Sequence, residues 1–383
     1  QTKGNQTMTT LMKNGRVIDM GLVDEIGKST VALAGNRFTY EKFDKKTETG
    51  GVIRGGKLSL DVALGVSLIH TLYEAYMKRT GAYAFHNDST APQNVNMPGT
   101  LKPRQFQLYE ANEVLAPRKV KRSSLAHRQW LFPTVLSDRR QVSMGVYPAH
   151  VRLYELYPEL YTHQVIYCDP DELGEMLAKF GIGVPRQTAR YWKRCALTMY
   201  NGFDGDPAKV FEHCDWTVAG VEEFKRAGEK KGCDPLPGYG PKITSLCFMY
   251  FTSLGLCKMP DDAFPVDMHV QRLFIQYGAL TKSDAVGNEL MEMVLRPFNC
   301  EVARRYELDK YHLSHAMWQL GRSSCTECYR KRGNELLCPI ATECSGNINA
   351  HDYFKLGEWP GEDDVMRKGF DREFRIPAGP LFQ

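Results

Sequence analysis

The spacing of apolar residues along the chain predicts a mainly helical protein with a small β-containing start. Between residues 8 and 58, short apolar runs alternate with glycine-containing turns, and we expect strands at 16–20 and 29–33. From 60 to 78 the apolar residues recur at helical intervals, which predicts a helix. Residues 81–117 contain prolines and polar residues with little periodicity, which is typical of a long loop or linker.

From residue 124 onward the pattern is helical almost throughout. Asp169 and Pro170 form a typical helix start, because an aspartate caps the first amides and proline fits the first turn. The amphipathic run 185–200 predicts another helix. The expected fold class is therefore mainly α. We expect an N-terminal extension at 1–117, a helical domain at 118–320, a cysteine-containing loop at 321–345 and a C-terminal tail at 346–383.

The composition, with 43% hydrophobic and 11% aromatic residues, is that of an ordinary globular protein. No apolar run approaches the ~20 residues needed to cross a bilayer, and the polar residues 1–7 do not form a signal peptide. We therefore expect a cytoplasmic protein that is not secreted and has no membrane partner. The net charge of +4 permits nucleic-acid binding without requiring it. Basic patches at 118–122 and 329–332 could contact phosphate or could be solvated loops.

The eleven cysteines fall into two groups. Most are scattered through helical sequence, as free thiols are in a reduced compartment. The other four lie close together with the spacing C-x2-C-x9-C-x5-C, which is typical of metal ligands. Four thiolates suit either tetrahedral zinc or a [4Fe–4S] cluster. These candidate ligands are Cys325, Cys328, Cys338 and Cys344.

Two short motifs carry candidate chemistry. In Gly238-Tyr239-Gly240-Pro241-Lys242, the glycines allow a tight turn and the proline suits a first helical position, so bare amides at the helix start could bind a phosphate. Asp267 precedes a helical run and, taken alone, is most simply a helix N-cap. Lys242, taken alone, is most simply a solvated lysine of a first turn.

Together, L-P-G-x-G-x-K at 236–242 and V-D-x-H-x-x-R at 266–272 resemble the signature of the helix-hairpin-helix DNA glycosylase superfamily, especially its endonuclease III branch. The resemblance spans roughly residues 125–345 and implies a two-subdomain helix-hairpin-helix fold with a C-terminal iron–sulfur loop. It implies that Lys242 is a nucleophile and Asp267 the essential carboxylate. The hairpin residues Gly238, Tyr239 and Gly240 would contact DNA. The gap between the motifs is longer than usual, which indicates an insertion around 254–262.

These residue types suit cleavage of an N-glycosidic bond. Positive charge develops on the sugar as the bond breaks, and an ionised carboxylate stabilises that charge. A lysine that has lost its proton can attack the sugar carbon and form a Schiff base. Such a pair requires a site shielded from water.

The resemblance also bears on the metal and on base flipping. It favours a [4Fe–4S] cluster over zinc, because the cysteines follow a G-R pair and end in C-x5-C, although the middle spacing departs from the family. The cluster would hold the basic residues Arg330, Lys331 and Arg332 against DNA. Arg139 occupies the place of the glutamine that fills the gap left by a flipped base. His269 and Tyr147 are candidate residues of the base pocket.

Three functions remain open, each with double-stranded DNA as the partner. The favoured one is excision of a damaged or modified base, with or without strand cleavage, because both Lys242 and Asp267 are retained. The alternative resembles the α-glutamyl/putrescinyl-thymine pyrophosphorylases, which install a free amino acid or polyamine on pyrophosphorylated 5-hydroxymethyl-uracil in viral DNA. The third is a non-catalytic reader of DNA.

Overall fold

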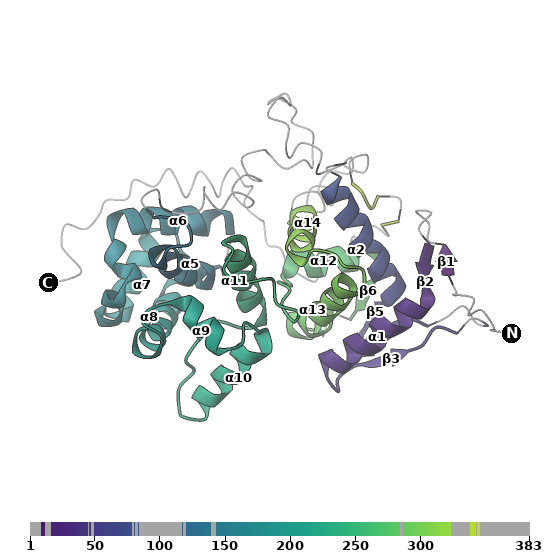
Figure 1. The fold of residues 1–383 in the computed structure, drawn as a ribbon, viewed down its shortest axis with the longest axis horizontal. Helices are drawn as coiled ribbons and strands as arrows, with labels where there is room; N and C mark the ends of the chain where they lie inside the picture. Colours follow the sequence, from purple (N-terminus) through teal and green to yellow (C-terminus); the bar gives the residue numbers. More distant parts are fainter. Residues whose placement is uncertain are drawn as a thin grey trace, which may run out of the picture. The chain divides into compact units, whose positions relative to one another are not determined.

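The structure is a computed structural model of the 383-residue chain. It describes residues 9–11, 17–44, 46, 50–78, 80, 83, 117, 120–138, 143–283, 286–322, 338–341 and 343–344. The chain forms two compact units: unit 1 comprises 1–103 and 266–357, and unit 2 comprises 104–265 and 358–383. Over the described ranges both units are mainly helical, as the sequence predicts (Figure 1). None of the helices in these ranges is long and apolar enough to cross a membrane.

Unit 1 contains an antiparallel sheet in the order β3-β4-β5-β6 and a separate β1-β2 pair. The strand β6 is distant from β5 in sequence but pairs with it, so that Leu60 lies opposite Leu280. One face of the sheet buries apolar side chains, including those of Ile53, Leu60 and Leu280. The elements are β1 (Thr9–Leu11), β2 (Val17–Asp19), α1 (Met20–Ala34), β3 (Thr39–Glu41), β4 (Val52–Gly55), β5 (Leu58–Asp61), α2 (Val62–Met77), α12 (Met268–Tyr277), β6 (Leu280–Lys282), α13 (Asn288–Arg305) and α14 (Lys310–Arg322).

The N-terminal part of the chain shares one core with these later helices. Helix α1 packs on α13, and α2 packs on α12, α13 and α14. The domain organisation expected from the sequence instead separates an extension ending at residue 117 from the helical domain. Strands of three or four residues carry no sequence signal for a distant partner, so this shared core cannot be predicted from their patterns.

The strand expected at 29–33 is wrong, because these residues belong to helix α1. Asp19 caps this helix: its Oδ1 accepts hydrogen bonds from the amides of Gly21 at 2.8 Å and Leu22 at 3.4 Å. The β-branched residues Thr30 and Val31 favour a strand locally, but burial at helical spacing decides the structure. The residues that α1 buries include Met20, Val23, Ile26, Gly27, Thr30 and Ala34.

Unit 2 is helical over its described residues. The predicted start at Asp169 is confirmed, since its carboxylate accepts the amides of Asp171 and Glu172, and the helix expected at 185–200 is present as α8. In unit 1 the strand expected at 16–20 and the helix expected at 60–78 are likewise present, as β2 and α2. The elements of unit 2 are α5 (Leu125–Ser137), α6 (Ser143–Leu156), the 3-10 helices η2 (Pro158–Tyr161) and η3 (His163–Tyr167), α7 (Pro170–Lys179), α8 (Pro185–Gly202), α9 (Pro207–His213), α10 (Val218–Glu229) and α11 (Pro241–Ser253).

A buried histidine joins three of these elements. His150 of α6 contacts the Tyr161 hydroxyl through Nδ1 at 2.7 Å and the Ser137 hydroxyl through Nε2 at 2.8 Å. Ser137 donates its own proton to the Pro133 carbonyl, so its oxygen accepts from His150, and the second ring nitrogen accepts from Tyr161. Burial lowers the pKa of His150 to about 3, which keeps the ring neutral. This network fixes the end of α5.

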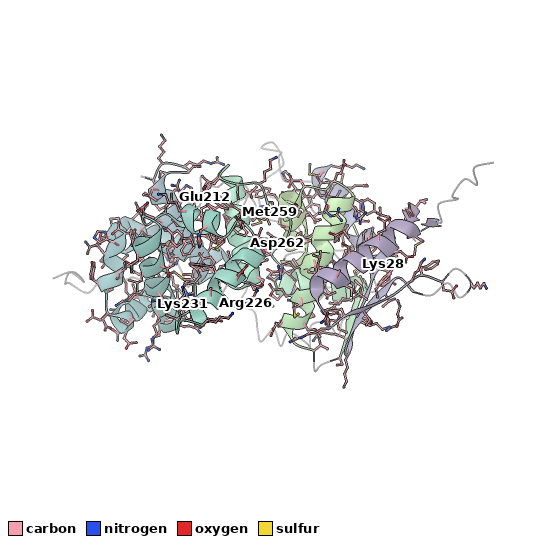
Figure 2. All side chains as sticks on the ribbon, turned by 60° about the horizontal axis from the view of Figure 1, so that its bottom comes forward. Lys28, Glu212, Arg226, Lys231, Met259 and Asp262 are labelled. Carbon is pink, nitrogen blue, oxygen red and sulfur yellow. The ribbon has the colours of Figure 1, made fainter. Side chains whose placement is uncertain are left out.

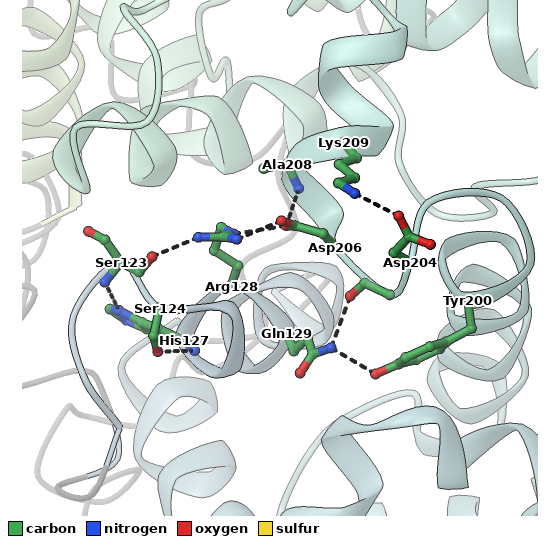
Figure 3. Close-up of polar contacts among 11 residues, drawn as sticks. Ser123, Ser124, His127, Arg128, Gln129, Tyr200, Asp204, Asp206, Ala208 and Lys209 are labelled. Atoms are coloured by element: carbon green, nitrogen blue, oxygen red, sulfur yellow. Dashed lines mark hydrogen bonds and ion pairs between the residues drawn. The ribbon is translucent and has the colours of Figure 1, made fainter.

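The start of α5 is fixed by a bidentate ion pair (Figure 3). Arg128 donates from Nε to Oδ1 of Asp206 at 2.8 Å and from Nη2 to Oδ2 at 2.5 Å. The same arginine donates to the Ser123 carbonyl, and the same aspartate caps α9 at the Ala208 amide. Only 17% of the arginine side chain and 14% of the aspartate side chain are exposed. The pair therefore joins α5, α9 and the segment that precedes α5.

We expect Arg128→Met to lower the free energy of unfolding by about 2 kcal/mol or more, because Asp206 would remain largely buried without its partner. Chemical denaturation of the full chain measures the loss. Lys209→Met is the matched control, since Lys209 forms an exposed pair with Asp204 at 2.6 Å and should leave the transition unchanged (Figure 3). Equal transitions for the two variants would contradict the assigned role of Arg128.

Candidate functional site

The glycine turn (residues 234–240) leads from α10 into α11, and no side chain among the described residues caps the start of that helix. Gly238 has φ 87°, in the left-handed region that favours glycine. Gly240 is the N-cap residue, and Pro241 occupies the first turn, as predicted. A Cβ atom at Gly240 would meet nothing within 4 Å. The start of α11 is therefore open within unit 2.

The carbonyl groups of this turn are held by side chains from α8 and α10. In contrast, the amides of Gly238, Gly240, Lys242 and Ile243 donate to no acceptor among the described residues. Amides arranged in this way at a helix start, where the helix dipole is positive, are suited to an anion. The carbonyl contacts are Arg194 Nε to Asp234 at 3.2 Å, Thr198 Oγ1 to Pro235 at 2.7 Å, Cys195 Sγ to Pro237 at 3.7 Å and Lys225 Nζ to Tyr239 at 3.0 Å.

The side chain of Tyr239 belongs to the core. It is fully buried, its hydroxyl donates to the Phe132 carbonyl at 2.7 Å, and its ring stacks on that of Phe132 with centroids 4.4 Å apart. These contacts fix the turn to α5. Tyr239 can therefore offer only its backbone to a ligand in this conformation.

Lys242 lies in the first turn of α11 and is half-buried. Its Nζ is 3.5 Å from the carbonyl oxygen of Asp138, the C-cap residue of α5. The C-terminal end of a helix carries partial negative charge and attracts a cation. Arg139, which follows Asp138, lies outside the described residues.

Asp267 belongs to unit 1 and caps helix α12. Its Oδ1 accepts the amides of His269 at 2.9 Å and Val270 at 3.0 Å, so the simple N-cap interpretation is correct. The residue is half-buried, and its Oδ2 accepts no hydrogen bond from the residues that the structure describes. One carboxylate oxygen is thus oriented by the helix while the other remains available. Lys242 belongs to unit 2 and Asp267 to unit 1.

A buried arginine links α12 to the end of α14, a role that sequence reasoning missed although Arg272 is the arginine of the V-D-x-H-x-x-R motif. Arg272 is 1% exposed, and its Nη2 donates to the Gly321 carbonyl and lies 3.1 Å from Nδ1 of His269. Gly321 packs so closely that a Cβ there would lie 2.7 Å from the His269 carbonyl oxygen. Gly321, where the cysteine segment (residues 321–345) begins, is therefore fixed to α12, the helix that Asp267 caps.

The end of the cysteine segment also packs on α12. Sγ of Cys344 lies 3.3 Å from the Gln276 carbonyl oxygen, and the Glu343 carboxylate accepts the Tyr277 hydroxyl and that of Ser67. Burial and the Glu343 carboxylate raise the pKa of Tyr277 well above its ordinary value. The segment is thus held on α12 at both ends.

Only part of the predicted ligand set falls within the described residues. Cys338 and Cys344 are half-buried cysteines separated by one turn, in which the Cys344 amide donates to the Ile340 carbonyl at 2.9 Å. The described ranges contain no group of three possible metal ligands. The two thiols suit a thiophilic metal site. Cys325, Cys328, Arg330, Lys331 and Arg332 lie outside the described residues.

The two predicted pocket residues are buried side chains. Tyr147 is 1% exposed and its ring lies 5.5 Å from that of Tyr250 on α11. His269 is 9% exposed and meets Trp318 edge-on. In the conformation described, both contribute to the packing of their own unit.

The predicted insertion at 254–262 is tied to unit 2. The Asp262 carboxylate accepts the amides of Val218 at 3.1 Å and Ala219 at 2.8 Å, and so caps α10 (Figure 2). Ser123 holds the start of the insertion by donating to the Leu254 carbonyl at 2.8 Å. The insertion therefore supports the helix that carries Lys225.

Comparison with models of known protein families gives no match, and comparison with curated proteins gives none either.

We expect Arg272→Met to lower the stability of the chain by about 3 kcal/mol, because the buried Gly321 carbonyl and His269 would lose a charged donor. Hydrogen exchange should rise most in α12 and at the end of α14. Arg54→Met is the control, since Arg54 of β4 and its partner Glu41 of β3 form an exposed ion pair in the same unit. Similar exchange in both variants would argue against the link between the two helices.

Proposed function

We propose that this protein is a DNA base-processing enzyme of the iron–sulfur helix-hairpin-helix glycosylase class, acting on a modified or damaged base flipped out of duplex DNA. In this proposal α10, the glycine turn and α11 form the hairpin. Unit 2 supplies the backbone-binding hairpin and Lys242. Unit 1 supplies Asp267 and the cysteine segment.

The observation that carries the proposal is the set of amides of Gly238, Gly240, Lys242 and Ile243, which donate to no acceptor among the described residues. They follow or belong to a turn whose carbonyls at 234, 235, 237 and 239 accept side-chain donors. A DNA phosphate would accept these amides without specifying sequence. Asp267 supports the chemistry, because its Oδ2, which accepts no hydrogen bond from the described residues, can face the positive charge that develops on a sugar. As the C1′–N bond breaks, the electron pair leaves with the base, and water or an amine takes its place on C1′.

The cofactor in this proposal is a [4Fe–4S] cluster held by Cys325, Cys328, Cys338 and Cys344. It would cross-link the segment that α12 holds at both ends, and its contribution would be structural. The half-buried thiols of Cys338 and Cys344 support the donor set. Zinc is the alternative occupant of the same ligands.

One contact favours the second candidate function, transfer of an amino acid or polyamine to pyrophosphorylated 5-hydroxymethyl-uracil. Lys242 lies at the negative end of α5, where its Nζ is 3.5 Å from the Asp138 carbonyl oxygen. A charged lysine is a poor nucleophile but a good partner for a departing pyrophosphate. In that reaction the amine forms a C–N bond as the C–O bond to pyrophosphate breaks.

Mass analysis of the products distinguishes these functions. With duplex DNA that contains modified bases, excision yields a free base and an abasic site, whereas transfer yields a heavier nucleoside. We expect excision, and we expect Asp267→Asn to slow it by about 100-fold or more. Asp61→Asn is the matched control, since Asp61 caps α2 in the same unit and accepts the Leu64 amide at 2.9 Å. Unchanged DNA would indicate a non-catalytic reader and overturn the proposal.

Metal analysis tests the cofactor. Purified protein should contain about four iron and four sulfide per chain, because the cluster has this composition. Cys338→Ser and Cys344→Ser should each lose most of the iron, whereas Cys233→Ser, at an exposed thiol of unit 2, should keep it. About one zinc per chain in place of iron would contradict the iron–sulfur assignment but leave the assignment of the four cysteine ligands unchanged.

A further inference from the structure

Lys225 of α10 connects the two ends of the glycine turn. Its Nζ donates to the Tyr239 carbonyl at 3.0 Å, at the end of the turn, and lies 3.5 Å from Oδ2 of Asp234, at its beginning. The other oxygen of that aspartate, Oδ1, accepts the Leu236 amide at 2.8 Å. The lysine side chain is 17% exposed and the aspartate side chain 24% exposed. One ammonium group thus spans the residues that lead into α11.

This contact controls which way the peptide groups of the turn face. A peptide whose carbonyl is bound by a side chain cannot rotate its amide inward without losing that hydrogen bond. The Tyr239 carbonyl belongs to the same peptide group as the Gly240 amide, which has no partner among the described residues. By binding the Tyr239 carbonyl, Lys225 keeps the Gly240 amide from rotating inward, so that this amide stays available to a ligand.

Glycine on both sides of Tyr239 makes this restraint valuable. Gly238 and Gly240 can adopt many backbone conformations, so an unrestrained turn would lose entropy on binding an anion. Lys225, assisted by Arg194 at the Asp234 carbonyl, limits that freedom in advance.

We propose that Lys225 is a positioning residue that presets the Gly240 amide, at the start of α11, for a phosphate of the DNA backbone. This inference rests on the proposed function. Lys225 acts through the turn, and its ammonium does not itself neutralise a phosphate.

The test measures affinity for a short fluorescein-labelled DNA duplex by anisotropy over a range of salt concentrations, with inorganic phosphate as competitor. Lys225→Met should weaken binding about tenfold, while the slope of log Kd against log salt stays that of the wild type. Lys231→Met is the control, because Lys231 is an exposed lysine just after the same helix and makes no side-chain contact with the turn in the structure described (Figure 2). It should weaken binding by less than about threefold.

Two further measurements separate positioning from loss of fold. Hydrogen exchange in Lys225→Met should rise within 234–243 and stay unchanged in α5 and α8. Lys225→Arg, which keeps the charge and the donors, should restore affinity to within about threefold.

The outcomes are distinguishable. If the wild type binds neither duplex nor phosphate, the proposed function fails. If the wild type binds and Lys225→Met binds equally well, the inference about Lys225 fails. A salt slope reduced by about 0.9 in Lys225→Met would make Lys225 a direct phosphate contact and would also overturn it. If exchange rises throughout unit 2 and Lys225→Arg does not restore binding, the lysine is structural only.

Discussion

Buried carbonyl groups require donors, and in the 234–240 turn those donors come from side chains of neighbouring helices. This requirement determines the orientation of the peptides, and hence which amides at the start of α11 have no acceptor among the described residues. It also fixes the start of α11 relative to α5, because the Tyr239 hydroxyl donates to the Phe132 carbonyl. The position of Lys242 beside the end of α5 follows from the same restraint. The candidate anion site and the candidate catalytic lysine are therefore two consequences of one packing arrangement.

Unit 1 uses the same principle at helix ends. The first amides of α12 are satisfied by Asp267, and the Gly321 carbonyl near the end of α14 by the buried guanidinium of Arg272. A capping carboxylate is held in one orientation, so structural and functional interpretations of Asp267 are compatible: Oδ1 serves the helix, and Oδ2 accepts no hydrogen bond from the described residues. The cysteine segment is anchored on this helix at Gly321 and Cys344. A metal bound there would stiffen the helix that presents the carboxylate.

Local signals in the sequence predicted the helix starts correctly. Asp169, Asp267 and the Gly240-Pro241 pair all lie at helix N-termini, because capping depends on a few adjacent residues. The sequence did not reveal the pairing of β5 with β6 or the contacts of Lys225 and Arg272, since these join residues distant along the chain. The error at 29–33 has the same origin: β-branched residues suggest a strand, and burial against α13 selects a helix. Arg139 and the basic residues at 330–332 fall outside the described residues, so their roles stay predictions.

The surroundings of Lys242 and those of Asp267 suit different chemical roles. A carboxylate can stabilise a cationic sugar, and the α12 amides already set the orientation of Asp267. A lysine acts as a nucleophile only as a neutral amine, and the Nζ of Lys242 lies 3.5 Å from the Asp138 carbonyl oxygen. Base excision with water as the acceptor therefore needs only the carboxylate of Asp267, whereas excision through a Schiff base also needs a neutral amine on Lys242. Transfer with loss of pyrophosphate is compatible with a charged lysine. The carboxylate supports bond cleavage in the first two cases, and a charged lysine is incompatible only with the Schiff-base route.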